Sequence, residues 1–321
     1  MIDKVLRRQE FAERPPVLMD IGAAGEIHPK WKRIAPYSVC IAFDADEREL
    51  GFAGKETGAY RKLWVYNCIA SDATTGDAEF YLTRSPHCSS LLRPQNDLLN
   101  AWAFSDLFVV ERKSRMKTLP LSKVMEDAGV GKIDWFKSDS QGTDLRLFRS
   151  LGENNVDRVL VAEFEPGIID AYEGEDKLWG ILAYMEKRPF WMADLAIKGS
   201  QRIRRESIPD HSSFLVRRFA SVVLKTSPGW GEVTYINTFP PDAEYLDKRD
   251  YLLGWVFSMV EEQYGFALEI ASRGFGRFDD PVFLGLEGDA LARIRFALLK
   301  LPLISSKFIS GRLANIVRKK L

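Results

Sequence analysis

The chain has 321 residues, enough for one large domain or for a domain with a substantial extension. Its 45 Lys and Arg residues balance its 45 Asp and Glu residues, so no net charge attracts nucleic acid, and a nucleic-acid enzyme is disfavoured. Three cysteines without a CxxC pair do not make a disulfide framework or favour a zinc site. The polar N-terminus and the lack of an apolar run of ~20 residues predict a cytoplasmic protein with no signal peptide and no transmembrane segment.

Apolar runs alternate with helical patterns from residue 17 to about residue 165, which is typical of a parallel sheet with helices on both faces. Strands of this sheet are predicted at residues 17–20, 39–44, 63–70, 133–139 and 159–165. An inserted antiparallel pair is predicted at 78–83 and 108–113. Helices are predicted at 122–128, 143–150 and 176–187.

Two further strands, at 190–197 and 214–224, bring the predicted sheet to seven. The connection between them, from Lys198 to His211, is expected to open on the ligand side of the sheet. Beyond residue 226 the strand alternation ends, and 251–272 and 288–300 read as helices rich in Leu, Phe and Trp. We therefore predict a Rossmann-like α/β domain over residues 1–225 and a helical C-terminal extension over 226–321. The extension is expected to pack on the main domain or on a second subunit, as in a homodimer.

The first predicted strand runs into a tight turn of small residues. Gly22 and Gly25 accept backbone angles closed to other residues and leave room for a ligand. Asp44, at the end of the second strand, can accept hydrogen bonds from both hydroxyls of a ribose. The dinucleotide pattern Gly-x-Gly-x-x-Gly fails here at two of its three glycines. Asp20 followed by Gly22 fits the Asp-x-Gly opening of S-adenosylmethionine enzymes better, which predicts a methyl-donor pocket.

Each acid of this predicted pocket has an expected role and an alternative. Asp20 is expected to face the ammonium group of the donor, and otherwise to form an Asx-type turn. Asp44 is the expected ribose ligand, with Asp46 as its competitor. Ser71 or Asp72, after the third strand, is expected to meet the adenine amino group, and the alternative for Asp72 is a solvated turn residue.

The region of the fourth strand carries the most specific pattern, Ile133-Asp134-Trp135-Phe136-Lys137-Ser138-Asp139-Ser140-Gln141-Gly142-Thr143-Asp144-Leu145. It resembles the signature Lys-x-Asp-x-(Glu or Gln)-Gly-x-(Glu or Asp) of the FkbM family of S-adenosylmethionine-dependent methyltransferases. Further pieces follow the order of that family over about residues 17 to 197: Ala70-Ser71-Asp72, Gly76, Ser89-Ser90-Leu91, Leu119-Pro120-Leu121 and Leu151-Gly152. The first motif departs from the family pattern Asp-x-Gly-Ala-Asn-x-Gly, because Ala24 replaces the Asn and Glu26 replaces the last Gly.

The resemblance implies a class I methyltransferase that moves a methyl group to the hydroxyl of a sugar, a glycan or a polyketide. An alcohol must lose a proton in this reaction, so a base or a divalent metal is expected near the methyl group. Asp139, at the end of the fourth strand, is the favoured base or metal ligand, with a helix N-cap as its structural alternative. Of the two acids that end the fifth strand, we favour Glu163 over Glu165 as its companion. Gln141 is expected to hydrogen-bond the acceptor.

Four residues outside the strands complete the predicted site. His87 and His211 lie in predicted loops and are candidate general bases, the alternative being surface histidines. Arg202 and Arg204, beside Arg205 in the connection before the last strand, are expected to bind an anionic acceptor such as a phosphorylated or nucleotide-linked sugar. The alternative for these arginines is a solvated loop.

The sequence thus predicts an S-adenosylmethionine-dependent O-methyltransferase that acts on a saccharide hydroxyl, in surface polysaccharide biosynthesis or on a glycosylated natural product. An NAD-dependent sugar oxidoreductase is an alternative, although no Tyr-x-x-x-Lys-type site is found. A degenerate methyltransferase fold that serves as a binding or scaffold module is the second alternative, motivated by the irregular first motif. The basic end Arg318-Lys319-Lys320 suggests peripheral contact with an anionic membrane, and a frayed terminus is the favoured interpretation.

Overall fold

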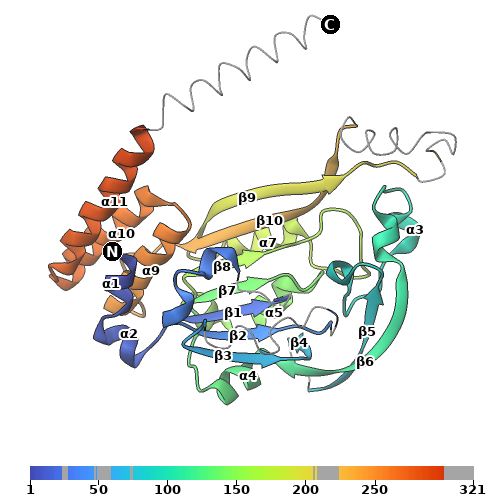
Figure 1. The fold of residues 1–321 in the computed structure, drawn as a ribbon, viewed down its shortest axis with the longest axis horizontal. Coiled ribbons are helices and arrows are strands. Elements are labelled where there is room, and N and C mark those ends of the chain that lie inside the picture. The colour runs from blue at the N-terminus through green and yellow to red at the C-terminus, as the bar shows by residue number, and fades with distance from the viewer. Residues whose placement is uncertain are drawn as a thin grey trace, which may run out of the picture. The chain divides into compact units, whose positions relative to one another are not determined.

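A mostly parallel sheet organises the larger of two units in the computed structural model (Figure 1). The structure describes residues 1–23, 28–46, 48, 59–72, 75–204, 207 and 224–299. The larger unit is Leu6–Tyr245, and the second unit combines Met1–Val5 with Leu246–Leu321. Within the described residues the sheet has seven strands in the order β3-β2-β1-β7-β8-β10-β9. Their bounds are β1 Val17–Ile21, β2 Val39–Phe43, β3 Lys62–Tyr66, β7 Trp135–Ser138, β8 Val161–Phe164, β9 Phe190–Ser200 and β10 Ser227–Asn237.

The first five of these strands along the sheet are parallel, and β10 runs antiparallel to both of its neighbours, β8 and β9. The prediction of an α/β fold with a seven-stranded, mostly parallel sheet is therefore confirmed, and the arrangement is compatible with a Rossmann-like fold. One face of the sheet packs against three helices through a common apolar core. These helices are α4 Leu121–Ala128, α5 Asp144–Ser150 and α7 Leu178–Met185.

The opposite face of the sheet carries 3-10 turns where a helix was expected after β1. Trp135 alternates with Phe136 along β7, so its ring lies on the face that does not contact the helices. There it meets Trp31, which ends the turn Pro29–Trp31, with the two rings 5.8 Å apart. A second turn, Ala35–Tyr37, leads directly into β2. Short helices complete the larger unit: α2 Gln9–Glu13, α3 Asn96–Leu99 and α6 Glu153–Val156.

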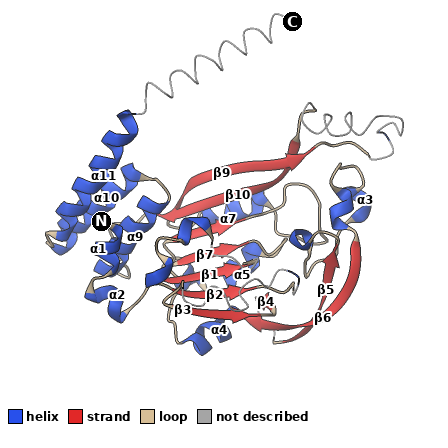
Figure 2. Cartoon of the chain, viewed as in Figure 1, coloured by secondary structure: helices blue, strands red, loops and turns tan. Residues whose placement is uncertain are grey.

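A second, smaller sheet joins β4 Ile69–Ser71, β6 Val110–Pro120 and β5 Gly76–Thr83 (Figure 2). The predicted antiparallel pair is confirmed, because β5 and β6 pair antiparallel along their length. The single strand predicted at 63–70 is wrong: it divides into β3 and β4, which belong to different sheets. Asn67, a residue that favours turns over strands, lies at this break.

The end of the large unit also differs from the prediction. The strand predicted at 214–224 falls, except for Leu224, outside the described residues, and β10 closes the sheet from residue 227 onward. The domain boundary predicted at 225/226 is therefore replaced by one after Tyr245. Ser227-Pro228-Gly229 reads as a turn in the sequence, but here it begins a strand with a register shift between Pro228 and Trp230, where a bulge accommodates proline.

The second unit is helical where the structure describes it, as predicted for the extension. It contains α1 Ile2–Leu6, which begins in this unit, and α9 Lys248–Val260, α10 Tyr264–Phe278 and α11 Val282–Leu299. Asp247 and Asp250 form a capping box that starts α9. The one long helix predicted from 251 divides into α9 and α10 at Glu262, whose φ of +57° is incompatible with a continuous helix. No helix among the described residues is long and apolar enough to cross a membrane.

Candidate functional site

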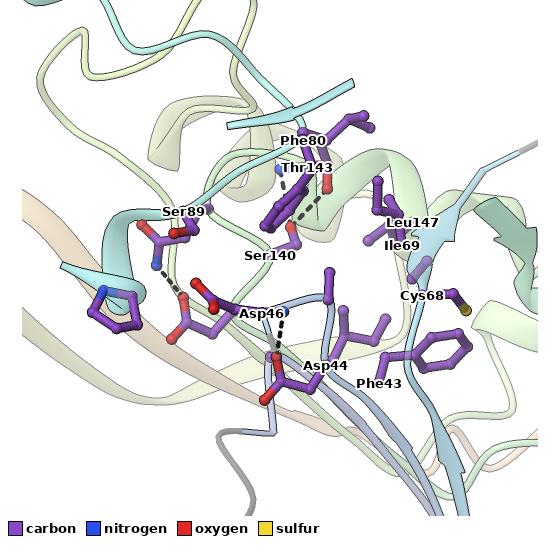
Figure 3. A pocket seen from close by; sticks show the side chains of 18 of the residues that line it. Phe43, Asp44, Asp46, Cys68, Ile69, Phe80, Ser89, Ser140, Thr143 and Leu147 are labelled. Atoms are coloured by element: carbon purple, nitrogen blue, oxygen red, sulfur yellow. Dashed lines mark hydrogen bonds between the residues drawn. The ribbon is translucent and has the colours of Figure 1, made fainter. Parts of the chain in front are cut away.

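A first cavity opens where β1, β2 and β7 end (Figure 3). Each strand contributes the residue that follows it: Gly22, Asp44 and Asp139. The carboxyl ends of parallel strands meet at one edge of an open sheet, and this edge is where such folds bind ligands. The rest of the wall is largely apolar: Phe43 from β2, Cys68 just before β4, Ile69 and Ala70 from β4, Phe80 from β5, Leu91 from the segment between β5 and β6, and Leu147 from α5.

Gly22 allows the turn after β1 to touch the segment after β7. Its φ is +81°, and a Cβ added to it would lie 2.3 Å from the backbone oxygen of Asp139. The amide of Gly22 donates to Phe43 at 3.0 Å, and the amide of Asp139 donates to Ile21 at 2.9 Å. Glycine is therefore required here for two reasons, the left-handed angle and the lack of space. Gly25, the second glycine predicted to matter, lies outside the described residues.

Asp44 and Asp46 both line this cavity, but they are engaged differently. One carboxylate oxygen of Asp44 accepts from the backbone amide of Asp46 at 2.9 Å, as Figure 3 shows. Arg48 binds both oxygens of Asp46, with Nη2 at 2.6 Å from Oδ2 and Nε at 2.9 Å from Oδ1. Burial raises the pKa of Asp46, but the hydrogen bonds from Arg48 outweigh it and hold the pKa below its ordinary value. Because both carboxylate oxygens of Asp46 bind Arg48, Asp44 is the acid better placed to bind a ligand.

Asp20 does not line the cavity, contrary to the role predicted for it. Its carboxylate accepts from the ammonium group of Lys137 on the neighbouring β7 at 2.8 Å, and its side chain is only 3% exposed. Burial lowers the pKa of Lys137, but the charges of Asp20 and Asp139 outweigh burial and raise it. Lys137 is therefore charged at neutral pH, and the pair stabilises the sheet beside the cavity.

Ser71 and Asp72 are not among the residues that line the first cavity either. The small sheet contributes Cys68, Ile69 and Ala70 instead, because the chain leaves the large sheet at Tyr66, earlier than predicted. Asp72 is exposed and Ser71 is buried in β4.

A second cavity of about 570 Å³ adjoins the first. Among the described residues, the two cavities share three lining residues, His87, Asp139 and Gln141. The second cavity is otherwise lined by aromatic, small and acidic residues, which include Phe104, Phe108, Glu165, Tyr172, Glu175 and Trp230. A volume of this size fits a small-molecule ligand.

Asp139 lies at the junction of the two cavities and is fixed from several sides. The amide nitrogen of Gln141 donates to its carboxylate, and the hydroxyl of Tyr172 lies 3.0 Å from the amide oxygen of Gln141. Gln141 has a φ of +56°, which is rare for a residue other than glycine and is found at functional sites. Asp144, the first residue of α5, accepts from the hydroxyls of Ser138 at 2.5 Å and Ser140 at 2.6 Å. These contacts hold the turn after β7 in one conformation.

The carboxyl group of Glu165 hydrogen-bonds with Asp139. Burial and then the charge of Asp139 raise the pKa of Glu165 to about 9, and burial also raises the pKa of Asp139. Two adjoining carboxyl groups with raised pKa values titrate as a pair and hold one proton between them at neutral pH. The site therefore contains a carboxylate hydrogen-bonded to a carboxylic acid.

Glu163 was predicted to accompany Asp139, but the structure places Glu165 beside Asp139 instead. Glu163 lies within β8 and accepts from the indole nitrogen of Trp135 at 2.6 Å and from Lys30 at 3.2 Å. These partners belong to the face that bears Trp31, and Glu163 lines neither cavity. Glu165 follows the last residue of β8, so its direction is set by the loop and not by the alternation of the strand.

Of the remaining predicted residues, only His87 reaches the cavities, where it lines both. His211 lies outside the described residues. Arg202 and Arg204 line neither cavity, and the guanidinium of Arg202 lies 5.9 Å from the centre of the Trp102 ring. The predicted recognition of an anionic acceptor by these two arginines therefore has no support in their placement. No group of three or more His, Cys, Asp or Glu that could hold a metal occurs in the described part of the chain.

The sequence analysis missed Tyr172, Glu175 and Trp230. Tyr172 and Glu175 belong to the loop that follows Pro166-Gly167, and Trp230 stands between two glycines. Prolines and glycines at these positions predict a loop or a bulge, but they do not predict which side chains lie at the edge of the sheet. The glycine at position 167 could have indicated a close approach of another segment. In the structure, a Cβ there would lie 2.3 Å from a carboxylate oxygen of Glu175.

Replacing Glu165 by Gln is expected to stabilise the protein at neutral and alkaline pH. The unfolded chain releases the Glu165 proton near its ordinary pKa of 4.5, whereas the folded chain keeps it until about 9. Between these values the folded state binds more protons, so the free energy of unfolding of the wild type falls as pH rises. We expect the stability advantage of Glu165→Gln over the wild type to grow from about pH 5 to about pH 8.5, by at most ~1.4 kcal/mol per pH unit, measured by urea unfolding. Glu173→Gln, at an exposed position of the same loop, serves as the control. Parallel pH dependences of wild type and Glu165→Gln would contradict the raised pKa.

No model of a known protein family matches the chain, and no curated protein matches it in sequence. What the chain does must therefore follow from its own residues and their geometry. That geometry offers two adjoining cavities at the carboxyl ends of a parallel sheet, with a hydrogen-bonded carboxyl pair where they meet. Such a site can hold two ligands side by side and take a proton from one of them.

Proposed function

We propose that this chain is an S-adenosylmethionine-dependent O-methyltransferase that methylates a hydroxyl group of a sugar, a glycan or a glycosylated natural product. The observation that carries the proposal is the meeting of two cavities at Asp139. A group-transfer enzyme has to bring two reactants to one point, and alignment supplies a large part of its rate enhancement. Asp139 and its neighbours also lie within the segment 133–145, which resembles the FkbM signature.

The first cavity is lined by groups suited to the nucleoside part of the donor. Asp44 follows β2, as expected of an acid that binds ribose hydroxyls, and the apolar wall formed by Phe43, Ile69 and Phe80 suits an adenine ring. Gly22 lets the turn after β1 lie against the backbone of Asp139, and both residues line the cavity. Asp20 has no part in this site, because it is committed to Lys137.

S-adenosylmethionine, when bound, supplies a methyl group that is already activated on a sulfonium centre. The chain must then orient the acceptor hydroxyl and remove its proton as the new carbon–oxygen bond forms. Asp139 is the carboxylate at the junction, and the proton moves from the acceptor oxygen to its carboxylate. Gln141 and Glu165 donate hydrogen bonds that orient Asp139, and Tyr172 in turn fixes Gln141.

Titration of the purified chain with S-adenosylmethionine and with NAD, followed by calorimetry, tests the donor site. We expect S-adenosylmethionine to bind and NAD to give no heat. Asp44→Asn should weaken donor binding about 10- to 100-fold, since it removes charge-assisted hydrogen bonds to the ribose.

Asp72→Asn is the matched control for this test, because Asp72 is an exposed acid that lines neither cavity. Its donor affinity should equal that of the wild type. A folded wild type that binds NAD but no donor would favour the oxidoreductase alternative. One that binds neither would favour the scaffold alternative.

A further inference from the structure

Aromatic rings form one continuous wall of the second cavity. Trp230 meets Phe104 edge to face with ring centres 6.3 Å apart, Phe104 meets Phe108 at 5.4 Å, and Phe108 meets Tyr172 at 5.6 Å. These residues come from three separate segments of the chain: β10, the segment 104–108 that contains the 3-10 turn Ser105–Phe108, and the loop after β8. Such a wall offers flat apolar surface to the face of a ring-shaped ligand.

The polar side of the same cavity is acidic. Asp139, Glu165 and Glu175 line it, and no Lys or Arg belongs to its lining among the described residues. His87 is the one basic side chain of this described lining. An anionic ligand group would therefore lose its water without gaining a counter-charge.

The charges of these acids are not equally compensated. Glu175 accepts from the ammonium group of Lys177 at 2.6 Å and from the amide of Ala171 at 2.6 Å. The cation nearest to Asp139, Lys137, forms its ion pair with Asp20. The pair Asp139–Glu165 therefore keeps its single negative charge at the junction, where it attracts a positive group of a ligand.

We propose that the second cavity binds a ring compound that carries an ammonium group, of the amino-sugar type, and discriminates against rings that carry carboxylate or phosphate groups. The ring lies against Trp230 and Phe104, and the ammonium group turns toward Asp139 and Glu165. An ammonium group also gains from the faces of aromatic rings, so the wall and the acids favour the same ligand. This inference rests on the proposed function in one respect, that the bound ring is the methyl acceptor.

Three probes that differ in one substituent test the ligand class: phenyl β-D-glucopyranoside, phenyl 2-amino-2-deoxy-β-D-glucopyranoside and phenyl β-D-glucuronide. Their affinities are measured by calorimetry at neutral pH and low salt, with the full chain. We expect the amine to bind about tenfold more tightly than the neutral glucoside, and the glucuronide to bind more weakly than both. Equal affinities, a preference for the glucuronide, or no binding of any probe overturns the proposal.

Two variants assign the effect to the cavity. The double variant Asp139→Asn/Glu165→Gln keeps the shape but removes the negative charge of the pair, and it should reduce the preference for the amine over the neutral glucoside to less than about threefold. Trp230→Leu should weaken all three probes by a similar factor, since the ring face is common to them. Glu173→Gln removes an acid from the same loop outside the cavity lining and should leave all three affinities unchanged. An undiminished amine preference in Asp139→Asn/Glu165→Gln, or unchanged affinities in Trp230→Leu, places the ligand elsewhere and overturns the proposal.

A parallel titration with S-adenosylhomocysteine separates this inference from the proposed function. Donor-product binding without binding of any phenyl glycoside contradicts the ligand class and leaves the donor site standing. Preferential binding of the amine without binding of S-adenosylhomocysteine supports the ligand class and contradicts the methyltransferase proposal.

Discussion

Replacing Asp139 by Asn is expected to lower kcat for methyl transfer by about 10³-fold, because the acceptor hydroxyl then has no carboxylate to take its proton. The amide keeps the size of the side chain, and the backbone contacts of residue 139 do not depend on its charge. Donor affinity should therefore stay within about threefold of the wild type, since the ribose ligand Asp44 is untouched. Initial rates with a saturating donor and calorimetric titration of the same preparation measure both quantities.

Glu165→Gln is the informative partner of this variant. It leaves Asp139 as a carboxylate and replaces a carboxylic acid donor by an amide donor, so activity should persist. The hydrogen bond from Glu165 lowers the pKa of Asp139, and an amide donates a weaker hydrogen bond than a carboxylic acid, so the acidic limb of the rate profile should shift to higher pH. If Asp139→Asn retains more than about a tenth of the wild-type kcat, the base lies elsewhere, and His87, which lines both cavities, is the next residue to replace.

The parts of the fold that the sequence predicted well are those in which local pattern and tertiary environment agree. β1, β2 and β7 are fully or largely buried, and their apolar runs are bounded by Gly22, Asp44 and Asp139. A buried parallel strand has little freedom in where it ends, so the residue that follows it is predictable. The positions of these three residues at one cavity follow from that constraint.

Side-chain direction was predictable only where it depended on strand ends. Asp139 follows the end of β7, but Asp20 lies inside β1, where Lys137 on the next strand neutralises it. The identity of a cross-strand partner depends on register, which apolar pattern alone does not give. The same limit explains Glu163, whose partner Lys30 is 133 residues away in the sequence.

Long connections account for the remaining differences. Pro228 and Gly229 signal a turn, and only pairing with β9 and β8 makes the segment from Ser227 a strand. Consequently Trp230 was placed in the predicted helical extension, although it belongs to the aromatic wall of the second cavity. Tyr172 was equally unpredictable, because its contact with Gln141 joins two loops that follow different strands.

Replacing Gly22 by Ala is expected to destabilise the protein by about 3–5 kcal/mol and to abolish donor binding. Two separate effects add here. A φ of +81° is strained for any residue with a Cβ, and the new Cβ would lie 2.3 Å from the carbonyl oxygen of Asp139. That neighbour is backbone, so relief requires the turns after β1 and β7 to move apart, and both turns line the first cavity. Urea unfolding measures the loss of stability, and donor titration measures the loss of the site.

Gly152→Ala isolates the first of these effects, the backbone strain. Gly152 has a nearly identical φ of +83°, and nothing lies within 4 Å of the Cβ that alanine would add. Its substitution should therefore cost only the backbone strain, about 1–3 kcal/mol, and leave donor affinity unchanged. The difference between the two variants is the free energy of the contact between the turn after β1 and Asp139. Equal losses of stability, with donor binding intact in Gly22→Ala, would mean that this contact does not shape the cavity. The same result would remove the steric reason for glycine at residue 22.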